Sequence, residues 1–203
     1  MQARPPDEVL AWLTHELRCE AVVDVAAMPG GSTSALHRVT LTDGHGHRLV
    51  VVLRRYVVER ILDENPHVAR QEATALELVE ASPVPTPKPL AADLDGRSGG
   101  APSVVMEHLD GVPVWEPRRR GEWIDRIVET LGQLREIVVP ADAVLPAIGR
   151  YDQRSWQPPG WAARSAVWER AIELFHRPVP EDDVGFVHRD FHPGNVLWRR
   201  GRL

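Results

Sequence analysis

The 203-residue chain contains almost no cysteine: Cys19 is the only one. A single cysteine cannot form an internal disulfide, which excludes the small disulfide-stapled scaffolds. Long apolar runs are also missing, because no stretch approaches the roughly 20 apolar residues that span a bilayer. The N-terminus lacks the apolar core of a secretion signal. We therefore expect a soluble cytoplasmic protein that has no membrane partner.

The chain also lacks an excess of positive charge. Its formal net charge is -5 and its pI is near 6.0, whereas general nucleic-acid binders usually present a basic face to the phosphates. The single basic run, residues 118–120, is short and typical of solvated surface. We expect no nucleic-acid partner. The apolar fraction of 43% is ordinary for a globular chain that buries a core.

The N-terminal half changes from one helix to strand patterning. Asp7 is a plausible N-cap for a helix that continues to Arg18, with apolar residues at helical spacing. Apolar runs typical of strands follow, and Asp43-Gly44-His45-Gly46 reads as a hairpin turn. The runs begin at Ala21, Leu36 and Leu49. We expect three antiparallel strands.

The turn between the first two of these strands is rich in glycine and hydroxyl residues. Gly30 and Gly31 permit a close backbone approach to a ligand, and Ser32, Thr33 and Ser34 add hydroxyl and amide donors. This chemistry suits phosphate groups. The alternative is a glycine-rich hairpin that binds nothing, since Gly-Gly-Ser is common in turns.

A cation and an acid occupy consecutive elements after this turn. Arg54 and Arg55 follow at the end of the third strand. One of them, and we favour Arg54, could point inward as a fixed cation for phosphate oxygens, although an arginine at a strand end is usually exposed. Residues 67–81 have the period of a helix, which carries Glu72 and Glu77. Both acids could be solvated. We expect Glu72 to pair with Arg54.

The second half of the chain is predominantly helical. Four prolines in residues 82–89 exclude a helix there and indicate a stiff connector before two further strands at 90–94 and 103–108. A long amphipathic helix is predicted from Glu122 to Val138, and another over residues 161–175. The second should bury one face formed by Val167, Trp168, Ala171 and Ile172. This order predicts an α+β fold.

Residues 187–198 carry the densest chemistry. Asp190 and Asn195 are separated by a Pro193-Gly194 turn, with apolar residues at both ends. A carboxylate and a carboxamide on a rigid loop can serve a hydroxyl group and a metal ion. Two alternatives are plain turn and cap chemistry, or a zinc cluster formed by His188, Asp190 and His192.

The stretch His188-Arg189-Asp190-Phe191-His192-Pro193-Gly194-Asn195 resembles the His-x-Asp-x-His-Pro-Gly-Asn catalytic loop of the aminoglycoside phosphotransferase and choline kinase-like family. The resemblance implies a protein-kinase-like fold with two lobes, an antiparallel-sheet N-lobe at 1–110 and an incomplete helical C-lobe at 111–203. It also implies transfer of the ATP γ-phosphate to a hydroxyl of a small molecule, with ATP and Mg²⁺ as cofactors.

The same resemblance implies a role for each matching residue. Asp190 would accept or orient the proton of the acceptor hydroxyl, His188 would brace the loop, and Asn195 would bind magnesium. Nucleotide contacts would come from residues of the N-lobe and the run into the hinge: Gly30, Gly31, Ser32, Arg54, Glu72 and Glu107.

The sequence departs from the family pattern at two places. Arg54 stands where kinases place lysine; it keeps the charge but presents a planar fork. The family also places a metal-binding aspartate downstream of the loop asparagine, whereas five residues follow Trp198 here. We therefore expect a truncated chain with an exposed apolar surface around the loop. The alternative function is a catalytically inactive fragment or pseudoenzyme that at most binds nucleotide or a partner.

Overall fold

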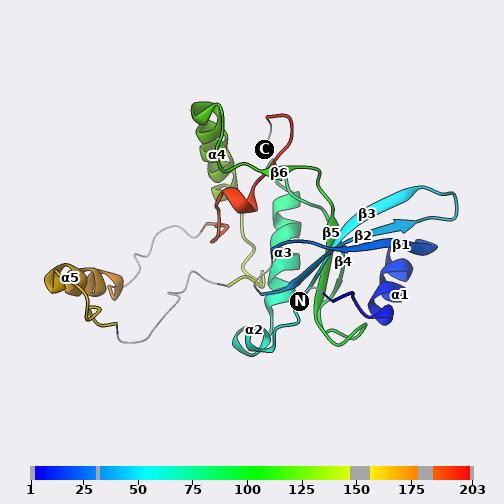
Figure 1. Cartoon of the computed structure of the whole chain (residues 1–203), viewed down its shortest axis with the longest axis horizontal. Helices are drawn as coiled ribbons and strands as arrows, with labels where there is room; N and C mark the ends of the chain where they lie inside the picture. Colours follow the sequence, from blue (N-terminus) through cyan, green and yellow to red (C-terminus); the bar gives the residue numbers. More distant parts are fainter. Residues whose placement is uncertain (1–2, 31–32, 147–155, 178–184, 202–203) are drawn as a thin grey trace. The chain divides into compact units, whose positions relative to one another are not determined.

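The structure is a computed structural model of the chain, and it describes residues 3–30, 33–146, 156–177 and 185–201. Two compact units are present, one formed by Met1–Leu145 with Gly185–Leu203 and the other by Pro146–Val184 (Figure 1). The predicted division at residues 110 and 111 stays a prediction. Within the described ranges, no helix combines the length and the apolar character that crossing a bilayer requires.

A five-stranded antiparallel sheet forms the centre of the first unit, with the order β1-β2-β3-β5-β4. The first three strands are consecutive hairpins, as the apolar alternation predicts. Their tight turn at Asp43 is closed by the Asp43 N–H, which donates to the His47 carbonyl at 3.1 Å. The strands are β1 Ala21–Ala27, β2 Ala35–Thr42, β3 Arg48–Arg55, β4 Pro89–Asp93 and β5 Ser103–Glu107.

One helix covers each face of this sheet (Figure 1). Helix α1, Asp7–Glu16, buries Val9, Leu10 and Leu13 against one face. Helix α3, Val68–Glu80, buries Ala69 and Ala73 against the other. Because side chains alternate along a strand, Leu53 of β3 faces α1, whereas Val52 and Arg54 face α3.

One local prediction in this part of the chain is wrong, and one short helix was not predicted. Pro6, not Asp7, occupies the N-cap of α1, and its carbonyl accepts from the Val9 N–H at 3.1 Å. Asp7 lies in the first turn, where its charge still complements the helix dipole. The short helix α2, Glu59–Glu64, was not predicted because it buries no residue and therefore has no apolar period.

Outside the sheet and its two covering helices, the first unit contains the loop at residues 187–198 and the short elements that contact it. Strand β6, Val112–Pro113, pairs with β7, Leu197–Trp198, and the 3₁₀ turn η1, Pro193–Asn195, precedes β7. Helix α4 runs from Arg120 to Arg135 and therefore ends three residues before the predicted Val138. An apolar cluster connects α3, α4 and the loop through Val79, Val84, Leu134 and Phe186, with Phe191 packed against it.

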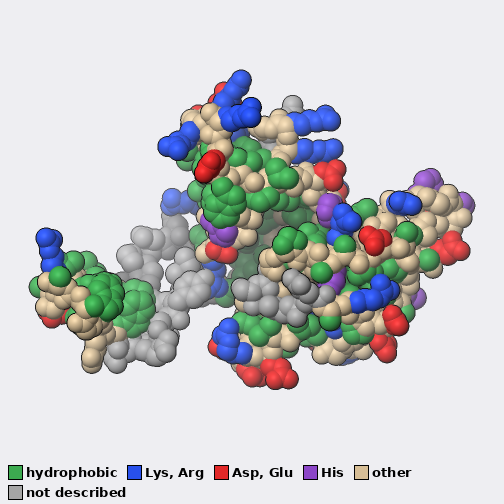
Figure 2. Space-filling view, in the orientation of Figure 1, with side chains coloured by type: hydrophobic (Ala, Val, Ile, Leu, Met, Phe, Trp, Pro, Cys, Tyr) green, Lys and Arg blue, Asp and Glu red, His purple; other side chains and the backbone are tan. Residues whose placement is uncertain are grey.

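The apolar face of α4 is largely open to solvent. On α4, Val128 is 60% exposed, and Trp115, which precedes the helix, is 64% exposed. Figure 2 shows hydrophobic side chains gathered in this part of the molecule beside arginine side chains. The predicted exposed apolar surface near the loop is present. Its other members include Val112, Ile124, Leu131, Val187 and Leu197.

The second unit contains helix α5, Ser165–Phe175. The prediction that this helix buries one face is wrong, since none of its residues is buried and Val167 is 61% exposed. Its contacts are between aromatic rings: Trp156 stacks on Phe175 with centroids 5.1 Å apart, and Trp161 meets Trp168 edge-on at 5.7 Å. The amphipathic period predicted the helix correctly but not how much of it is covered.

Candidate active site

The strand cation and the helix acid form a short ion pair. Arg54 Nη1 lies 2.7 Å from Glu72 Oε1, and the Arg54 Nε donates to Ser34 Oγ at 2.9 Å. The Arg54 side chain is 31% exposed and that of Glu72 is 16% exposed. Strand β3 directs Arg54 toward α3, and α3 directs Glu72 back toward the sheet. The structure therefore brings together the two residues that the sequence predicted as partners.

Tyr56 is a third member of this cluster and was assigned no role from the sequence. Its hydroxyl donates to Glu72 Oε2, and its ring centroid lies 5.5 Å from the Arg54 guanidinium carbon. The only sequence signal is its position two residues after Arg54, which places both side chains on the same face of the strand.

Burial and charge compete in this cluster. Burial lowers the pKa of Arg54, but the negative charge of Glu72 and its hydrogen bond to Arg54 outweigh burial and raise that pKa. Burial and the adjacent Glu72 carboxylate raise the pKa of the Tyr56 hydroxyl far above its ordinary range. Arg54 therefore stays charged, and Tyr56 stays a hydrogen-bond donor.

The glycine turn lies between β1 and β2, and its described part is consistent with a tight connection. The Met28 N–H donates to the Leu36 carbonyl at 2.9 Å, and Gly30 has a φ of +103°, a conformation that favours glycine. The predicted residues Gly31 and Ser32 lie outside the described residues. Ser34 is buried and its hydroxyl accepts from Arg54, so it supports the cation rather than facing a ligand.

Glu107 ends β5 at the beginning of the segment that leaves the sheet. Its backbone pairs with Val51 of β3, and its N–H donates to the Lys88 carbonyl at 2.9 Å. This N–H is therefore already engaged. Its carbonyl and side chain are the groups through which Glu107 could contact a nucleotide.

The loop groups Asp190 and Asn195 are joined by local hydrogen bonds. The Asn195 side-chain amide donates to the Asp190 carbonyl oxygen and to Asp190 Oδ2, both at 2.9 Å. The Asp190 side chain is 73% exposed. Because Asn195 uses its amide nitrogen toward Asp190, its Oδ1 is left for a cation, while Asp190 remains accessible to a substrate hydroxyl.

The backbone of the loop is tightly specified around these two side chains. Arg189 has a φ of +64°, and the Asp190 N–H donates to the His188 carbonyl at 2.8 Å, so the chain turns sharply just before the carboxylate. At Gly194 an added Cβ would lie 2.7 Å from His192 Cε1 and 3.0 Å from Trp115 Cζ2. Glycine is therefore the residue that fits between these two rings.

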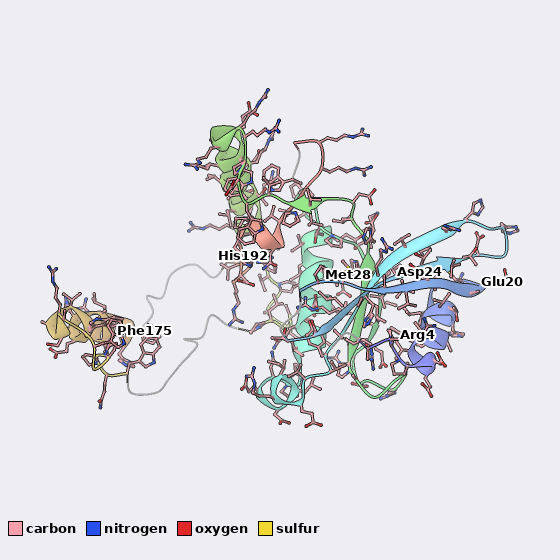
Figure 3. The ribbon with its side chains drawn as sticks, in the orientation of Figure 1. Arg4, Glu20, Asp24, Met28, Phe175 and His192 are labelled. Carbon is pink, nitrogen blue, oxygen red and sulfur yellow. The ribbon has the colours of Figure 1, made fainter. Side chains whose placement is uncertain are left out.

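The two loop histidines have different surroundings. The His188 ring packs edge-on against Phe191, with centroids 5.5 Å apart, and Phe191 contacts the apolar cluster. Removal of solvent lowers the pKa of His188, although the Asp190 charge opposes this shift. His192 lies beside η1 (Figure 3), and its Nδ1 accepts from the Gly194 N–H at 3.0 Å.

Few candidate metal ligands surround the loop. Among the residues that the structure describes, no group of three or more histidine, cysteine, aspartate or glutamate side chains could hold a metal ion. This finding disfavours the zinc-cluster alternative, in which His188, Asp190 and His192 would converge. The Oδ1 oxygen of Asn195 fits the preference of Mg²⁺ for hard oxygen ligands, and phosphates and water usually complete the shell of this ion.

Comparison with known proteins identifies the family. The sequence pattern of the phosphotransferase enzyme family matches residues 30–203, which is most of the chain. The chain belongs to the phosphotransferase enzyme family. The predicted resemblance is therefore confirmed, and the matched region contains the glycine turn, the Arg54–Glu72 pair and the loop.

Three solved structures align with this chain, and one of them, at a TM-score of 0.56, shares its fold. The amicoumacin kinase hAmiN, solved with AMP-PNP, Ca²⁺ and Ami, aligns over 97% of this chain and 62% of its own length, at 16% identity and a TM-score of 0.56. A Ralstonia eutropha JMP134 protein assigned to the aminoglycoside phosphotransferases aligns over 64% of this chain and 37% of its own, at 17% identity and a TM-score of 0.48. Aminoglycoside phosphotransferase APH(4)-Ia covers 65% of this chain and 40% of its own, at 16% identity and a TM-score of 0.39.

The alignment with hAmiN confirms the α+β, protein-kinase-like fold class. The chain spans between 37% and 62% of the length of these structures. No curated protein matches the sequence significantly.

Proposed function

We propose that this phosphotransferase-family chain binds ATP and carries the catalytic loop for transfer of the γ-phosphate to a hydroxyl group of a small molecule. One observation supports this most directly: the loop holds the Asp190 carboxylate exposed while Asn195 donates to its Oδ2 at 2.9 Å. A carboxylate that is oriented by one hydrogen bond and otherwise open to solvent can still accept a proton from a bound substrate.

The loop residues would act on the acceptor. Asp190 would orient the acceptor hydroxyl and take its proton, with Asn195 holding Oδ2 so that the carboxylate does not rotate. His188 would brace the loop by packing on Phe191, which is itself anchored to the apolar cluster. These residues would position the acceptor and remove its proton. Positioning of the reactants is a main contribution of the protein to phosphoryl transfer.

The N-terminal residues would act on the nucleotide. Arg54, held by Glu72 and Ser34, would present a fixed positive charge to phosphate oxygens. Gly30, Gly31 and Ser32 would approach the phosphates through the β1–β2 turn, and Glu107 would contact the base where β5 ends. Asn195 Oδ1 would hold Mg²⁺, which would neutralise negative charge on the phosphates.

The test is magnesium-dependent ATP consumption by the purified chain with a panel of hydroxylated small molecules. Turnover that requires an acceptor and disappears in Asp190→Ala would support the proposal. Binding of AMP-PNP without turnover would favour the second candidate, a nucleotide-binding protein without catalysis. No nucleotide binding at all would overturn the proposal.

A further inference from the structure

Glu72 divides its two carboxylate oxygens between two different partners. Oε1 accepts from Arg54 Nη1 at 2.7 Å, and Oε2 accepts from the hydroxyl of Tyr56. Carboxylates often grip a guanidinium with both oxygens, in two parallel hydrogen bonds. Here Oε2 is directed to the Tyr56 hydroxyl instead, and no hydrogen bond from Arg54 to Oε2 is present among the described residues.

Tyr56 is fixed in this place by the fold. Its side chain is buried, with 3% exposure, and its ring belongs to the apolar cluster that includes Ala69, Ala73, Val104 and Met106. The Tyr56 N–H donates to the Pro102 carbonyl at 2.9 Å, which holds the backbone just after β3. The hydroxyl therefore has little freedom to leave Glu72.

The hydrogen-bond donors of Arg54 can be counted. A guanidinium carries five N–H groups. The structure uses Nε toward Ser34 and one Nη1 hydrogen toward Glu72, and the Nη2 group donates to no described residue. If both oxygens of Glu72 accepted hydrogen bonds from Arg54, one from Nη1 and one from Nη2, then Nη2 would be paired with Glu72 and directed toward α3.

We propose that Tyr56 is a positioning residue that restricts Glu72 to one oxygen on Arg54, so that Arg54 Nη2 stays available to a nucleotide phosphate. This inference rests on the proposed function, because it assumes that Arg54 contacts phosphate. It adds a residue whose hydroxyl controls how the cation is presented, in addition to the ion pair itself.

The variant Tyr56→Phe removes the hydroxyl and keeps the ring that fills the cluster. We expect the dissociation constant for Mg²⁺–AMP-PNP, measured by calorimetry, to rise about tenfold, the size of one charge-assisted hydrogen bond. The matched control is Thr130→Val, which removes another buried hydroxyl, one that donates to the Arg126 carbonyl within α4. It should leave the nucleotide affinity unchanged.

A double-mutant cycle separates positioning from general damage. Lysine has no fork for a carboxylate to grip, so in an Arg54→Lys background Tyr56→Phe should change nucleotide affinity by less than about twofold. Equal losses in the wild-type and Arg54→Lys backgrounds would show that Tyr56 acts only through stability, and would overturn the inference.

A crystal structure of nucleotide-free Tyr56→Phe provides a readout that does not depend on nucleotide binding. The expected result is Glu72 Oε2 at about 2.8 Å from Arg54 Nη2. An Oε2 that instead stays in place and binds water would overturn the inference. If the wild-type chain binds no nucleotide, the proposed function fails, while this contact still decides whether Tyr56 controls the ion pair.

Discussion

The Arg54–Glu72 pair and the Asp190–Asn195 pair reach comparable hydrogen-bond distances by different routes. Arg54 and Glu72 are 18 residues apart and meet because a strand packs on a helix. Asp190 and Asn195 are five residues apart and meet because a turn brings the chain back on itself. The first pair is mostly buried, whereas the Asp190 side chain is 73% exposed.

The difference in burial determines whether a substitution in each pair affects stability, ligand affinity or catalysis. A change in the buried pair leaves an unmatched charge in a packed region, so it should cost stability as well as ligand affinity. A change in the exposed pair meets solvent, so it should cost chemistry and little else. Four predictions test this contrast, beginning with the largest effect.

Asp190→Asn should reduce turnover with a working acceptor by about 100-fold or more, since an amide cannot accept the proton. The melting temperature should change by less than about 2 °C, because the side chain is exposed. Steady-state kinetics and a thermal melt measure the two quantities on the same sample. A large loss of stability would contradict the local character assigned to the loop.

Glu72→Ala should lower the free energy of unfolding by about 1–3 kcal/mol, because it leaves the Arg54 charge and the Tyr56 hydroxyl without their partner. This range is below that of fully buried pairs because Arg54 retains some solvent contact. Urea denaturation measures it.

The control for Glu72→Ala is Glu129→Ala. Glu129 pairs with Arg126 at 2.9 Å on α4, but both side chains are more than half exposed. We expect a change below about 0.5 kcal/mol. Equal losses in the two variants would remove the distinction between the buried pair and a surface pair.

Asn195→Ala should lower the free energy of unfolding by less than about 1 kcal/mol, since the lost hydrogen bonds lie at the surface. Its main effect should be on the magnesium dependence of turnover, because both the Oδ1 oxygen and the restraint on Asp190 are removed. A magnesium titration at saturating ATP measures this shift. Unchanged magnesium dependence would remove Asn195 from the proposed metal ligands.

The smallest effect concerns His188, whose pKa is lowered in the folded protein. The unfolded chain therefore binds more protons as the pH falls through the ordinary histidine value, so stability is full above about pH 6.5 and declines below it. His188→Gln should reduce this decline by well under about 1.4 kcal/mol, the value of one pKa unit, because His188 is exposed and solvent screens its interactions. Denaturation of both proteins at several pH values between about 5 and 8 measures the difference. If stability fell more steeply with decreasing pH in the variant than in the wild type, folding would raise the His188 pKa rather than lower it.

Much of the fold followed from short-range patterns. Apolar alternation and turn residues predicted the strands around Asp43, and the helical period predicted α3 within one residue at each end. The loop motif predicted the family. Patterns of this kind are readable because the period of a strand or helix is a local property of the backbone.

Other features left no local signal. Pro6 took the cap from Asp7, and the two-residue strands β6 and β7 pair across 84 or more positions of sequence. The apolar period of α5 was correct, but the burial inferred from it was not. Periodicity states which face of a helix is apolar, whereas burial depends on which other elements reach that face.

The sequence by itself determined the family, the sheet, and the order of cation, acid and catalytic loop, because these are carried by residue types at fixed spacing. Only the tertiary structure decided that Ser34 supports Arg54 and that Tyr56 takes the second oxygen of Glu72. Both contacts join separate elements, so their existence depends on how the strand and helix pack. The partners of most buried polar groups depend on tertiary packing, because burial favours a hydrogen bond to whichever acceptor the neighbouring element brings within reach.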